Sequence, residues 1–144
     1  MAKTVRDAMT PSVRSAAPAQ SVVEAAQMMK EEDVGSLPVV EEDRLIGIVT
    51  DRDIVVRTVA ERVDPESVKV GDVASRELVT VEPGQDLDEA LTLMARHRVR
   101  RLPVVEAGRL VGMLAQADVA LEAKEKKAGE MLDEISQPTS TARE

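Results

Sequence analysis

The chain repeats itself once, without a gap, at an offset of 65 residues. Residues 5–57 align with residues 70–122, and 17 of the 53 aligned positions carry the same amino acid. The longest shared run is Leu-Pro-Val-Val-Glu, which begins at Leu37 and again at Leu102. An ungapped match of this length indicates that the two halves are copies of one structural unit. A unit of about 55 residues buries too little surface to be comfortable alone, so we expect the copies to pack on each other as a pseudo-twofold pair.

Each copy predicts the same order of elements, β-α-β-β-α, and therefore a fold of the α/β (α+β) class. The first helix of each copy follows a capping-box pattern, Ser21-x-x-Glu24 or Asp86-x-x-Glu89. Apolar residues then recur at i, i+3, i+4 and i+7, which is the spacing of one buried helical stripe. Short, nearly continuous apolar runs predict strands with little exposure to solvent. The predicted segments are extended residues 13–16 and 78–81, strands 37–40, 45–49, 102–105 and 110–114, and second helices over 51–61 and from Gln116 onward.

The repeat also divides the chain into segments. The prediction is a first unit over residues 1–62, a linker over 63–69, a second unit over 70–122, a helix over 123–135 and a disordered tail over 136–144. The helical segment has an apolar strip of Met131, Leu132 and Ile135, which we expect to dock on the body or on a dimer mate. The tail is polar and contains Pro138, which favours disorder.

The composition excludes several kinds of function. The chain has no Cys, a single His and no Phe, Tyr or Trp, so a disulfide scaffold, a thiolate metal site and base stacking on aromatic rings are excluded. A net charge of −8 argues against nucleic acid as a partner, and no stretch is long and apolar enough for a membrane span. There is no Ser/His/Asp or Cys/His set, P-loop or dinucleotide fingerprint, which favours a binding module over an enzyme. We therefore expect a cytoplasmic, non-catalytic protein without a metal or a resident cofactor.

Three repeated elements carry a resemblance to a known family. They are the Leu-Pro-Val-Val strand, the Arg-Leu-x-Gly that begins at Arg44 and Arg109, and the segment from Gly47 to Asp53 with its counterpart from Gly112 to Asp118. Over residues 4–122 the chain resembles the tandem cystathionine-β-synthase (CBS) domain pair, or Bateman module, and in particular the short stand-alone bacterial members of the hypoxic-response type. The resemblance implies two CBS units with ligand clefts between them, a homodimer and a regulated partner protein. It also implies an adenosyl ligand, namely AMP, ADP or ATP, with S-adenosylmethionine and NAD as alternatives.

The resemblance assigns Thr50 to the phosphate and Asp53 to the ribose of such a ligand, with Asp118 as the ribose residue of the second copy. A carboxylate suits a ribose because it accepts hydrogen bonds from both vicinal hydroxyls, and a helix N-terminus suits a phosphate. The alternative is structural, since Thr50-x-x-Asp53 is also a pair that caps a helix. The second copy has Ala115 in place of the threonine, and an aspartate that is kept without its capping partner favours the ligand role.

The only dense basic run extends from Arg96 to Arg101. Its first three residues are predicted to end a helix, where cations complement the helix dipole. The resemblance assigns Arg100 and Arg101 to phosphate contacts, and we expect them to approach the cleft of Thr50 and Asp53 from the other repeat. Arg52, in the first turn of the second helix, is a further candidate phosphate ligand. Because Ala115 has no hydroxyl, the sequence predicts one dominant site per chain, centred on Asp53.

Two other functions stay open at this point. Ala115, Gly35 and Ser36 favour a constitutive structural or interaction protein with degenerate clefts. Ala115 lacks the hydroxyl of Thr50, and Gly35 and Ser36 stand where the second copy has two arginines. Nucleotide hydrolysis at Asp51 and Asp53 has little support. The second helix of the first copy is more apolar than one buried face requires, so we expect it to contact a second copy of the chain. The residues concerned are Ile54, Val55, Val56 and Val59.

Overall fold

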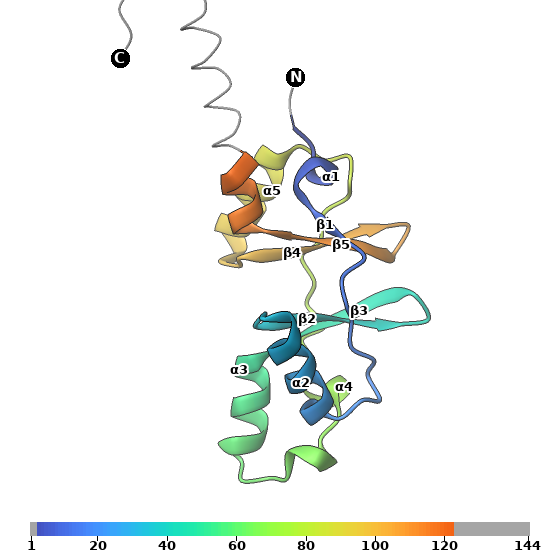
Figure 1. The fold of residues 1–144 in the computed structure, drawn as a ribbon, viewed down its shortest axis with the longest axis vertical. Helices are drawn as coiled ribbons and strands as arrows, with labels where there is room; N and C mark the ends of the chain where they lie inside the picture. Colours follow the sequence, from blue (N-terminus) through green and yellow to red (C-terminus); the bar gives the residue numbers. More distant parts are fainter. Residues whose placement is uncertain (1–2, 123–144) are drawn as a thin grey trace, which may run out of the picture.

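The computed structural model describes residues 3–122, and its elements follow the order of the sequence repeat. The first half contains α1 (Val5–Ala8), β1 (Thr10–Pro11), α2 (Val22–Glu32), β2 (Ser36–Glu41), β3 (Arg44–Thr50), α3 (Asp51–Ile54), the π-helix η1 (Val55–Val59) and the 3₁₀-helix η2 (Pro65–Ser67). The second half contains α4 (Val70–Val73), α5 (Leu87–His97), β4 (Arg101–Glu106) and β5 (Arg109–Ala115), followed by helical residues 116–122. In Figure 1 the two hairpins lie in the middle of the molecule and the helices cover their outer faces. The predicted α+β class is confirmed.

The predicted strand pairs form one antiparallel hairpin in each half. The β2–β3 register runs from Ser36 opposite Thr50 to Glu41 opposite Arg44, and the β4–β5 register repeats it 65 residues later. Both two-residue turns have positive φ at each residue, 52° and 67° in the first and 54° and 80° in the second. Such turns match the right-handed twist of the flanking strands. The hairpins meet at their tips, where the Leu45 N–H donates to the Gly108 carbonyl at 3.2 Å.

The extended segments predicted at 13–16 and 78–81 are shorter than strands. Each is reduced to one parallel bridge, between Ala16 and Val39 and between Val81 and Val104. Two strand pairings within residues 3–122 lie outside the hairpins. Strand β1 is antiparallel to β5 with Thr10 opposite Met113, and β3 meets β5 where Arg44 lies opposite Arg109. Pro18 follows the first bridge closely and has no N–H to extend the pairing.

The helices α2 and α5 form as predicted, but their first turns are not both capped as predicted. The Ser21 hydroxyl accepts from the Glu24 N–H at 3.2 Å, whereas Asp86 makes no side-chain cap bond. Neither helix has the reciprocal bond of a capping box, because the glutamate at the third position accepts from a glutamine instead. The donors are the Nε2 atoms of Gln20 and Gln85, at 3.0 and 3.2 Å. The prediction of two capping boxes is therefore wrong, because the side chains of Glu24 and Glu89 are paired with Gln20 and Gln85.

The two halves exchange their first helical turns. The N–H of Val5 donates to the Gln85 carbonyl at 2.8 Å, and the N–H of Val70 donates to the Gln20 carbonyl at 2.8 Å. Val5 is fully buried in the hydrophobic cluster of α5, β4 and β5, and Val70 in the cluster of α2, β2 and β3. Figure 1 shows α1 beside α5 in the upper unit, and α4 beside α2 in the lower one. The predicted boundaries, 1–62 and 70–122, thus follow the sequence repeat, whereas each core is completed by a turn from the other half.

A capping box formed by Thr4 and Asp7 begins α1, the turn that packs on the second unit. The Thr4 N–H donates to Asp7 Oδ2 at 2.9 Å, and this bond lowers the pKa of Asp7 below its ordinary value. Because the pKa is lowered in the folded state, the stabilising effect is present above the ordinary pKa of an aspartate. It is lost as the pH falls through the lowered pKa of the folded state.

The repeated Gly47 and Gly112 lie where the exchanged segments touch the hairpins. A Cβ at Gly47 would lie 2.8 Å from the Ser75 carbonyl oxygen, and one at Gly112 would lie 2.7 Å from the Thr10 carbonyl oxygen. Real Cβ atoms do not approach backbone oxygens this closely. The Arg-Leu-x-Gly motif therefore ends in glycine because another backbone crosses the strand at that point.

The second helix of the first half is not a plain α-helix. After the four residues of α3 the chain forms η1, a π-helical turn, around the buried Thr58. The Thr58 hydroxyl donates to the Ile54 carbonyl at 2.6 Å, and such bonds to the preceding turn often bend helices. The valines within this π-helical turn, Val55, Val56 and Val59, are exposed.

The last predicted segments, the helix over 123–135 with Met131, Leu132 and Ile135 and the tail over 136–144, lie outside the described residues. The second helix of the second copy does begin at Gln116, as predicted, and it is helical up to residue 122. Among the helices within residues 3–122, none has the length and apolar character needed to cross a membrane.

We predict that Gly47→Ala and Gly112→Ala each lower the free energy of unfolding by about 1–3 kcal/mol, because the added methyl group displaces a crossing backbone. Gly84→Ala is the matched control, since a Cβ there meets no atom within 4 Å. Urea denaturation of the three variants measures the difference. Equal stability of Gly47→Ala and Gly84→Ala would contradict this prediction, because it would show that the crossing segment can shift away from the added methyl group without a loss of stability.

Candidate functional site

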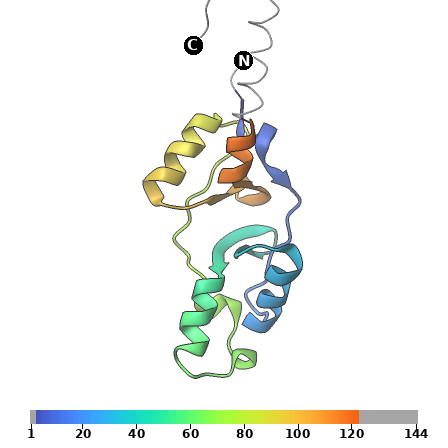
Figure 2. The same cartoon turned by 60° about the vertical axis from the view of Figure 1, so that its left-hand side comes forward.

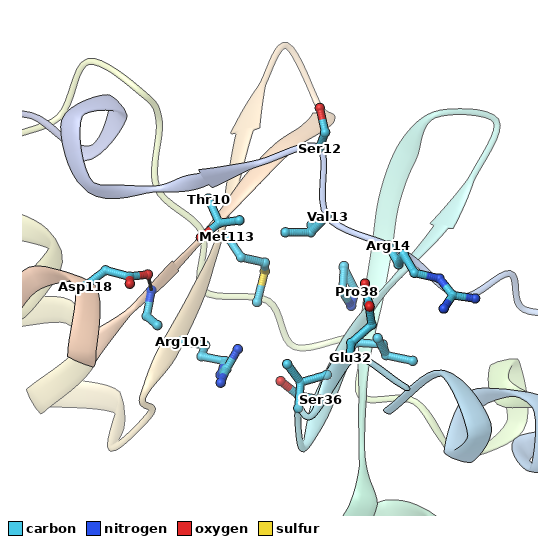
Figure 3. A pocket seen from close by; sticks show the side chains of 13 residues that line it. Thr10, Ser12, Val13, Arg14, Glu32, Ser36, Pro38, Arg101, Met113 and Asp118 are labelled. Carbon is cyan, nitrogen blue, oxygen red and sulfur yellow. Dashed lines mark hydrogen bonds between the residues drawn. The ribbon is translucent and has the colours of Figure 1, made fainter. Parts of the chain in front are cut away.

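A cleft of about 310 Å³ opens between the two units, where the hairpins face each other (Figure 3). Its volume lies at the lower end of the range for small-molecule sites, roughly 300–1,000 Å³. One wall comes from the second unit, the opposite wall from the first, and the segment from β1 to Arg14 crosses between them. The lining residues are Thr10, Ser12, Val13, Arg14, Glu32, Val34, Ser36, Leu37, Pro38, Arg101, Met113, Ala115 and Asp118.

Arg101 and Asp118 place opposite charges on the wall of the second unit. Arg101 begins β4 directly opposite Ala115, the last residue of β5, and Asp118 follows three residues later in the helix. Asp118 Oδ2 accepts from the Ala115 N–H at 3.3 Å, which leaves Oδ1 outside this bond. Figure 3 shows Arg101 extending from this wall toward Ser36 of the first unit. A guanidinium and a carboxylate thus share one small cleft.

The opposite wall carries a second pair of charged residues. Glu32 ends α2 and Ser36 begins β2, while Arg14 follows the crossing segment. Arg14 is held beside Glu31 by a 3.6 Å ion pair between exposed side chains. The crossing segment includes Ser12 with φ of 55°, in the left-handed region that residues other than glycine rarely occupy.

The cleft can hold a small molecule that combines an anionic group with hydroxyls and a flat apolar part. The guanidinium of Arg101 is the cation for a phosphate or carboxylate, with the hydroxyls of Thr10 and Ser36 on the same cleft. Asp118 can accept from vicinal hydroxyls through its remaining oxygen atom. Val13, Pro38 and Met113 supply apolar surface of the kind that packs on a planar ring.

Thr50 and Asp53 form a capping box at the start of α3. The Thr50 N–H donates to Asp53 Oδ2 at 3.0 Å, and the Asp53 N–H donates to Thr50 Oγ1 at 3.0 Å. The structural alternative for this pair is therefore confirmed. Neither residue lines the cleft described above, and neither does Arg52. Whether the pair also holds a ligand remains a prediction.

Asp118 also has a local role that the sequence did not reveal. Its bond from the Ala115 N–H is the same half of the capping box that Asp53 makes with Thr50. The argument that an aspartate without a capping partner has no structural reason to persist is therefore wrong, because the backbone N–H of Ala115 serves as the partner.

Arg101 lies with the aspartate of its own repeat, and not with Thr50 and Asp53 as expected. Arg101 is paired with Ala115, the last residue before the helix, and this pairing brings it to the cleft that Asp118 also lines. Arg100 lies outside this cleft, and its carbonyl accepts from the Gln116 N–H at 2.8 Å. Both arginines border a second, shallower hollow of about 540 Å³ over residues 115–120. Arg101 thus connects the hollow with the cleft.

The sequence did not identify the residues of the crossing segment and of the first unit as site residues. These are chiefly Thr10, Ser12, Arg14, Glu32 and Ser36. One signal was present, since no aligned position between Asp7 and Pro18 is identical in the two copies. A stretch in which the two copies share no residue is free to take a different role in each copy, such as lining a binding site. Within residues 3–122, no three acidic or histidine side chains are grouped to hold a metal ion.

Comparisons with known proteins agree with this arrangement. The family model described as CBS domain matches residues 5–59 and again residues 70–125. The CBS domain-containing protein YhcV of Bacillus subtilis is 43% identical over 134 residues, covering 92% of this chain and 95% of its own. Hypoxic response protein 1 of Mycobacterium tuberculosis is 36% identical over 140 residues, covering 96% of this chain and 98% of its own. The crystal structure of CBSX2 in complex with AMP has a TM-score of 0.75 at 31% identity, covering 86% of this chain and 98% of that one.

We predict that Thr50→Ala lowers the free energy of unfolding by about 1 kcal/mol, because the Asp53 N–H loses its acceptor. Ala115→Thr is the reciprocal change and should raise stability by a similar amount, since it supplies the missing acceptor at the equivalent position. Urea denaturation measures both changes. A neutral Thr50→Ala would contradict the role of the capping box.

Proposed function

Because the chain belongs to the CBS-domain family as a tandem pair, we propose that it is a stand-alone regulatory protein that binds an adenine nucleotide between its two units. Binding would change the surface that the protein presents to a regulated partner protein. The proposal is one of ligand sensing, without catalysis. It rests on family membership for the regulatory type, and on the cleft of this chain for the ligand.

The observation that carries the proposal is the joint presence of Arg101 and Asp118 in one cleft. A nucleoside monophosphate has a phosphate dianion and a ribose diol, separated by a few bonds. A guanidinium recognises the first through charge-assisted hydrogen bonds, and a carboxylate oxygen accepts from the second. Both walls and the crossing segment line the cleft, so one ligand would contact both units at once.

Among the candidate ligands, AMP suits the cleft best. The volume of about 310 Å³ is small, and Arg101 is the cation on the wall that carries Asp118. The related CBSX2 protein was crystallised with AMP. ADP, ATP, S-adenosylmethionine and NAD are larger and would extend out of the cleft, over the hollow beside Arg100. They belong in the test panel.

We also propose that the protein is a homodimer. Val55, Val56 and Val59 are 53%, 42% and 69% exposed, which is unusual for three neighbouring valines on one helix. Ile54 does not belong to this surface, in contrast to the sequence expectation, because it packs against the first hydrophobic cluster. The π-helical turn separates the inward Ile54 from the outward valines.

One observation favours the second candidate function, a constitutive interaction module. Thr50 and Asp53 already satisfy each other in a capping box, and Ala115 has no hydroxyl at the equivalent position. Such a protein would bind no nucleotide in either cleft. It would act only through its outer surfaces.

Calorimetric titration with AMP tests the ligand and its place. We expect a single AMP per chain and a loss of affinity of about tenfold or more in Arg101→Gln, because a hydrogen bond to a charged group contributes roughly 1.5–3 kcal/mol. Asp118→Asn should weaken binding as well, although its amide oxygen can still accept from Ala115. Arg96→Gln, an exposed arginine outside the cleft, is the control and should bind as the unmodified protein does.

The same titration with Asp53→Asn separates the two possible sites. Retained affinity supports the cleft of Asp118, whereas lost affinity in Asp53→Asn with an unaffected Asp118→Asn moves the site to the first repeat, as the sequence predicted. A thermal-shift panel of AMP, ADP, ATP, S-adenosylmethionine and NAD covers the other ligands. A ligand at 100 times its Kd stabilises the fold by about 2.7 kcal/mol. No shift with any of them would favour the interaction module.

A further inference from the structure

The hollow beside Arg100 and Arg101 carries charge of one sign. It is lined by Arg100, Arg101, Ala115, Gln116, Ala117 and Ala120, so two cations border it and no acidic side chain does. Both arginines are exposed, and neither forms an ion pair with another residue within 3–122. We refer to this surface as the arginine hollow. It is a place where an anionic segment can meet two guanidinium groups at once.

The elements that border the arginine hollow place no carboxylate in it. On the helix of residues 116–122, Asp118 lines the cleft instead and accepts from the Ala115 N–H at 3.3 Å. Glu122, at the other end of this helix, forms an ion pair with Lys3 at 3.8 Å. The last turn of α5, which precedes the two arginines, has basic residues and no acidic one. The positive charge of the hollow is therefore not neutralised by these elements.

The repeat shows that the scaffold does not require the residues of the hollow. In both copies the first N–H of the helix donates to a preceding carbonyl, from Asp51 to Gly35 at 2.9 Å and from Gln116 to Arg100 at 2.8 Å. The backbone is thus alike, and the side chains differ. The equivalent residues, with the first copy named first, are Gly35 and Arg100, Ser36 and Arg101, Asp51 and Gln116, Arg52 and Ala117, and Val55 and Ala120. The second copy has two additional cations before the helix, and on the helix it has no charge and smaller side chains.

The alanines leave the hollow open along the helix. Figures 1 and 2 both show residues 116–122, in orange, as a helix that stands on the hairpin of the second unit. Gln116, Ala117 and Ala120 are exposed on this helix. Small-molecule sites bury most of their ligand, whereas an exposed surface of this kind does not. It suits an extended peptide, whose backbone can lie against alanine and exchange hydrogen bonds with the glutamine amide.

We propose that the arginine hollow binds an acidic segment of the regulated partner protein. Two carboxylates of the segment are held by Arg100 and Arg101, and its backbone lies along Ala117 and Ala120. Hydrogen bonds between guanidinium groups and carboxylates are roughly twice as strong as those between neutral groups. The proposal rests on the proposed function, because that function requires a partner, and it states where and by which chemistry the partner binds.

Arg101 lines both the arginine hollow and the nucleotide cleft, so the ligand can control the partner. A guanidinium that binds the phosphate of the ligand has fewer donors left for a carboxylate. The phosphate dianion also repels a carboxylate bound to the same side chain. Nucleotide and partner therefore compete, and each lowers the affinity of the other by the same factor.

A short acidic segment fits this surface better than a nucleic acid does. The chain has a net charge of −8, and the end of α2, which is equivalent to the basic end of α5, carries Glu31, Glu32 and Asp33. A long polyanion would extend from the hollow over acidic surface of this kind and would be repelled there. A segment of a few residues meets the hollow alone.

Fluorescence anisotropy with a labelled peptide of alternating glutamate and alanine tests the surface on the full chain. We expect Arg100→Gln to weaken peptide binding by about tenfold and to leave AMP binding unchanged, because Arg100 lies outside the cleft. Asp118→Asn should weaken AMP binding and leave peptide binding unchanged, and Arg101→Gln should weaken both. Arg76→Gln, an exposed arginine outside the hollow and the cleft, is the control and should change neither. Saturating AMP should lower the peptide affinity of the unmodified protein by about fivefold or more.

The possible failures of this experiment separate the parts of the proposal. Equal peptide binding by Arg100→Gln and the unmodified protein, or no binding at about 1 mM peptide, overturns the docking surface. A duplex oligonucleotide that binds more tightly than the peptide assigns the hollow to nucleic acid and also overturns it. Unchanged peptide affinity in saturating AMP overturns the competition alone. Peptide binding by a protein that binds none of the nucleotides supports the docking surface and contradicts the proposed function.

Discussion

The contact of a crossing backbone with a glycine determines how the two halves of this chain are joined. The Thr10 carbonyl lies against Gly112, and the Ser75 carbonyl lies against Gly47, so each hairpin is bound to a segment from the other repeat. The turns that precede these segments, α1 and α4, bury Val5 and Val70 in the opposite cores. Because neither core is complete without a turn from the other half, the two units cannot separate without losing buried surface. The residues between β1 and Arg14 must then cross the gap between the units, and they become a wall of the cleft.

The symmetry of the scaffold makes the departures from symmetry informative. Core positions such as Val39 and Val104 are the same in both copies because both units bury the same interior. The copies differ in the cleft, where Ser36 of the first copy is equivalent to Arg101 of the second. They also differ on the outer face, where Ala26 is equivalent to Leu91. These differences have no role in either core. The proposed ligand site depends on one of them, Arg101, together with Asp118, which both copies share.

The sequence predicted the helices and the hairpin strands, and it missed capping bonds and the contacts that depend on the exchange. The amphipathic stripes of α2 and α5 and the apolar runs of the hairpins are local, so their positions were predicted correctly. The bond from the Ala115 N–H to Asp118 was missed because every residue except proline has a backbone N–H, so a motif of side chains does not reveal this donor. Arg101 was expected beside Asp53 but lines the cleft of Asp118, because the repeat alone does not show on which unit a segment packs. The residues of β1 were missed for the same reason, since they lie in the first copy and pair with β5 of the second.

The exchange also couples the cleft to the spacing of the two units. Asp118 lines the cleft from the second unit, and Glu32 and Ser36 line it from the first. A ligand held by both walls would favour one spacing of the two units, and a dimer whose contacts depend on that spacing would respond to the ligand. Ligand binding and dimerisation would then be linked by a free energy that acts equally in both directions, so a nucleotide that strengthens the dimer would bind the dimer more tightly by the same factor.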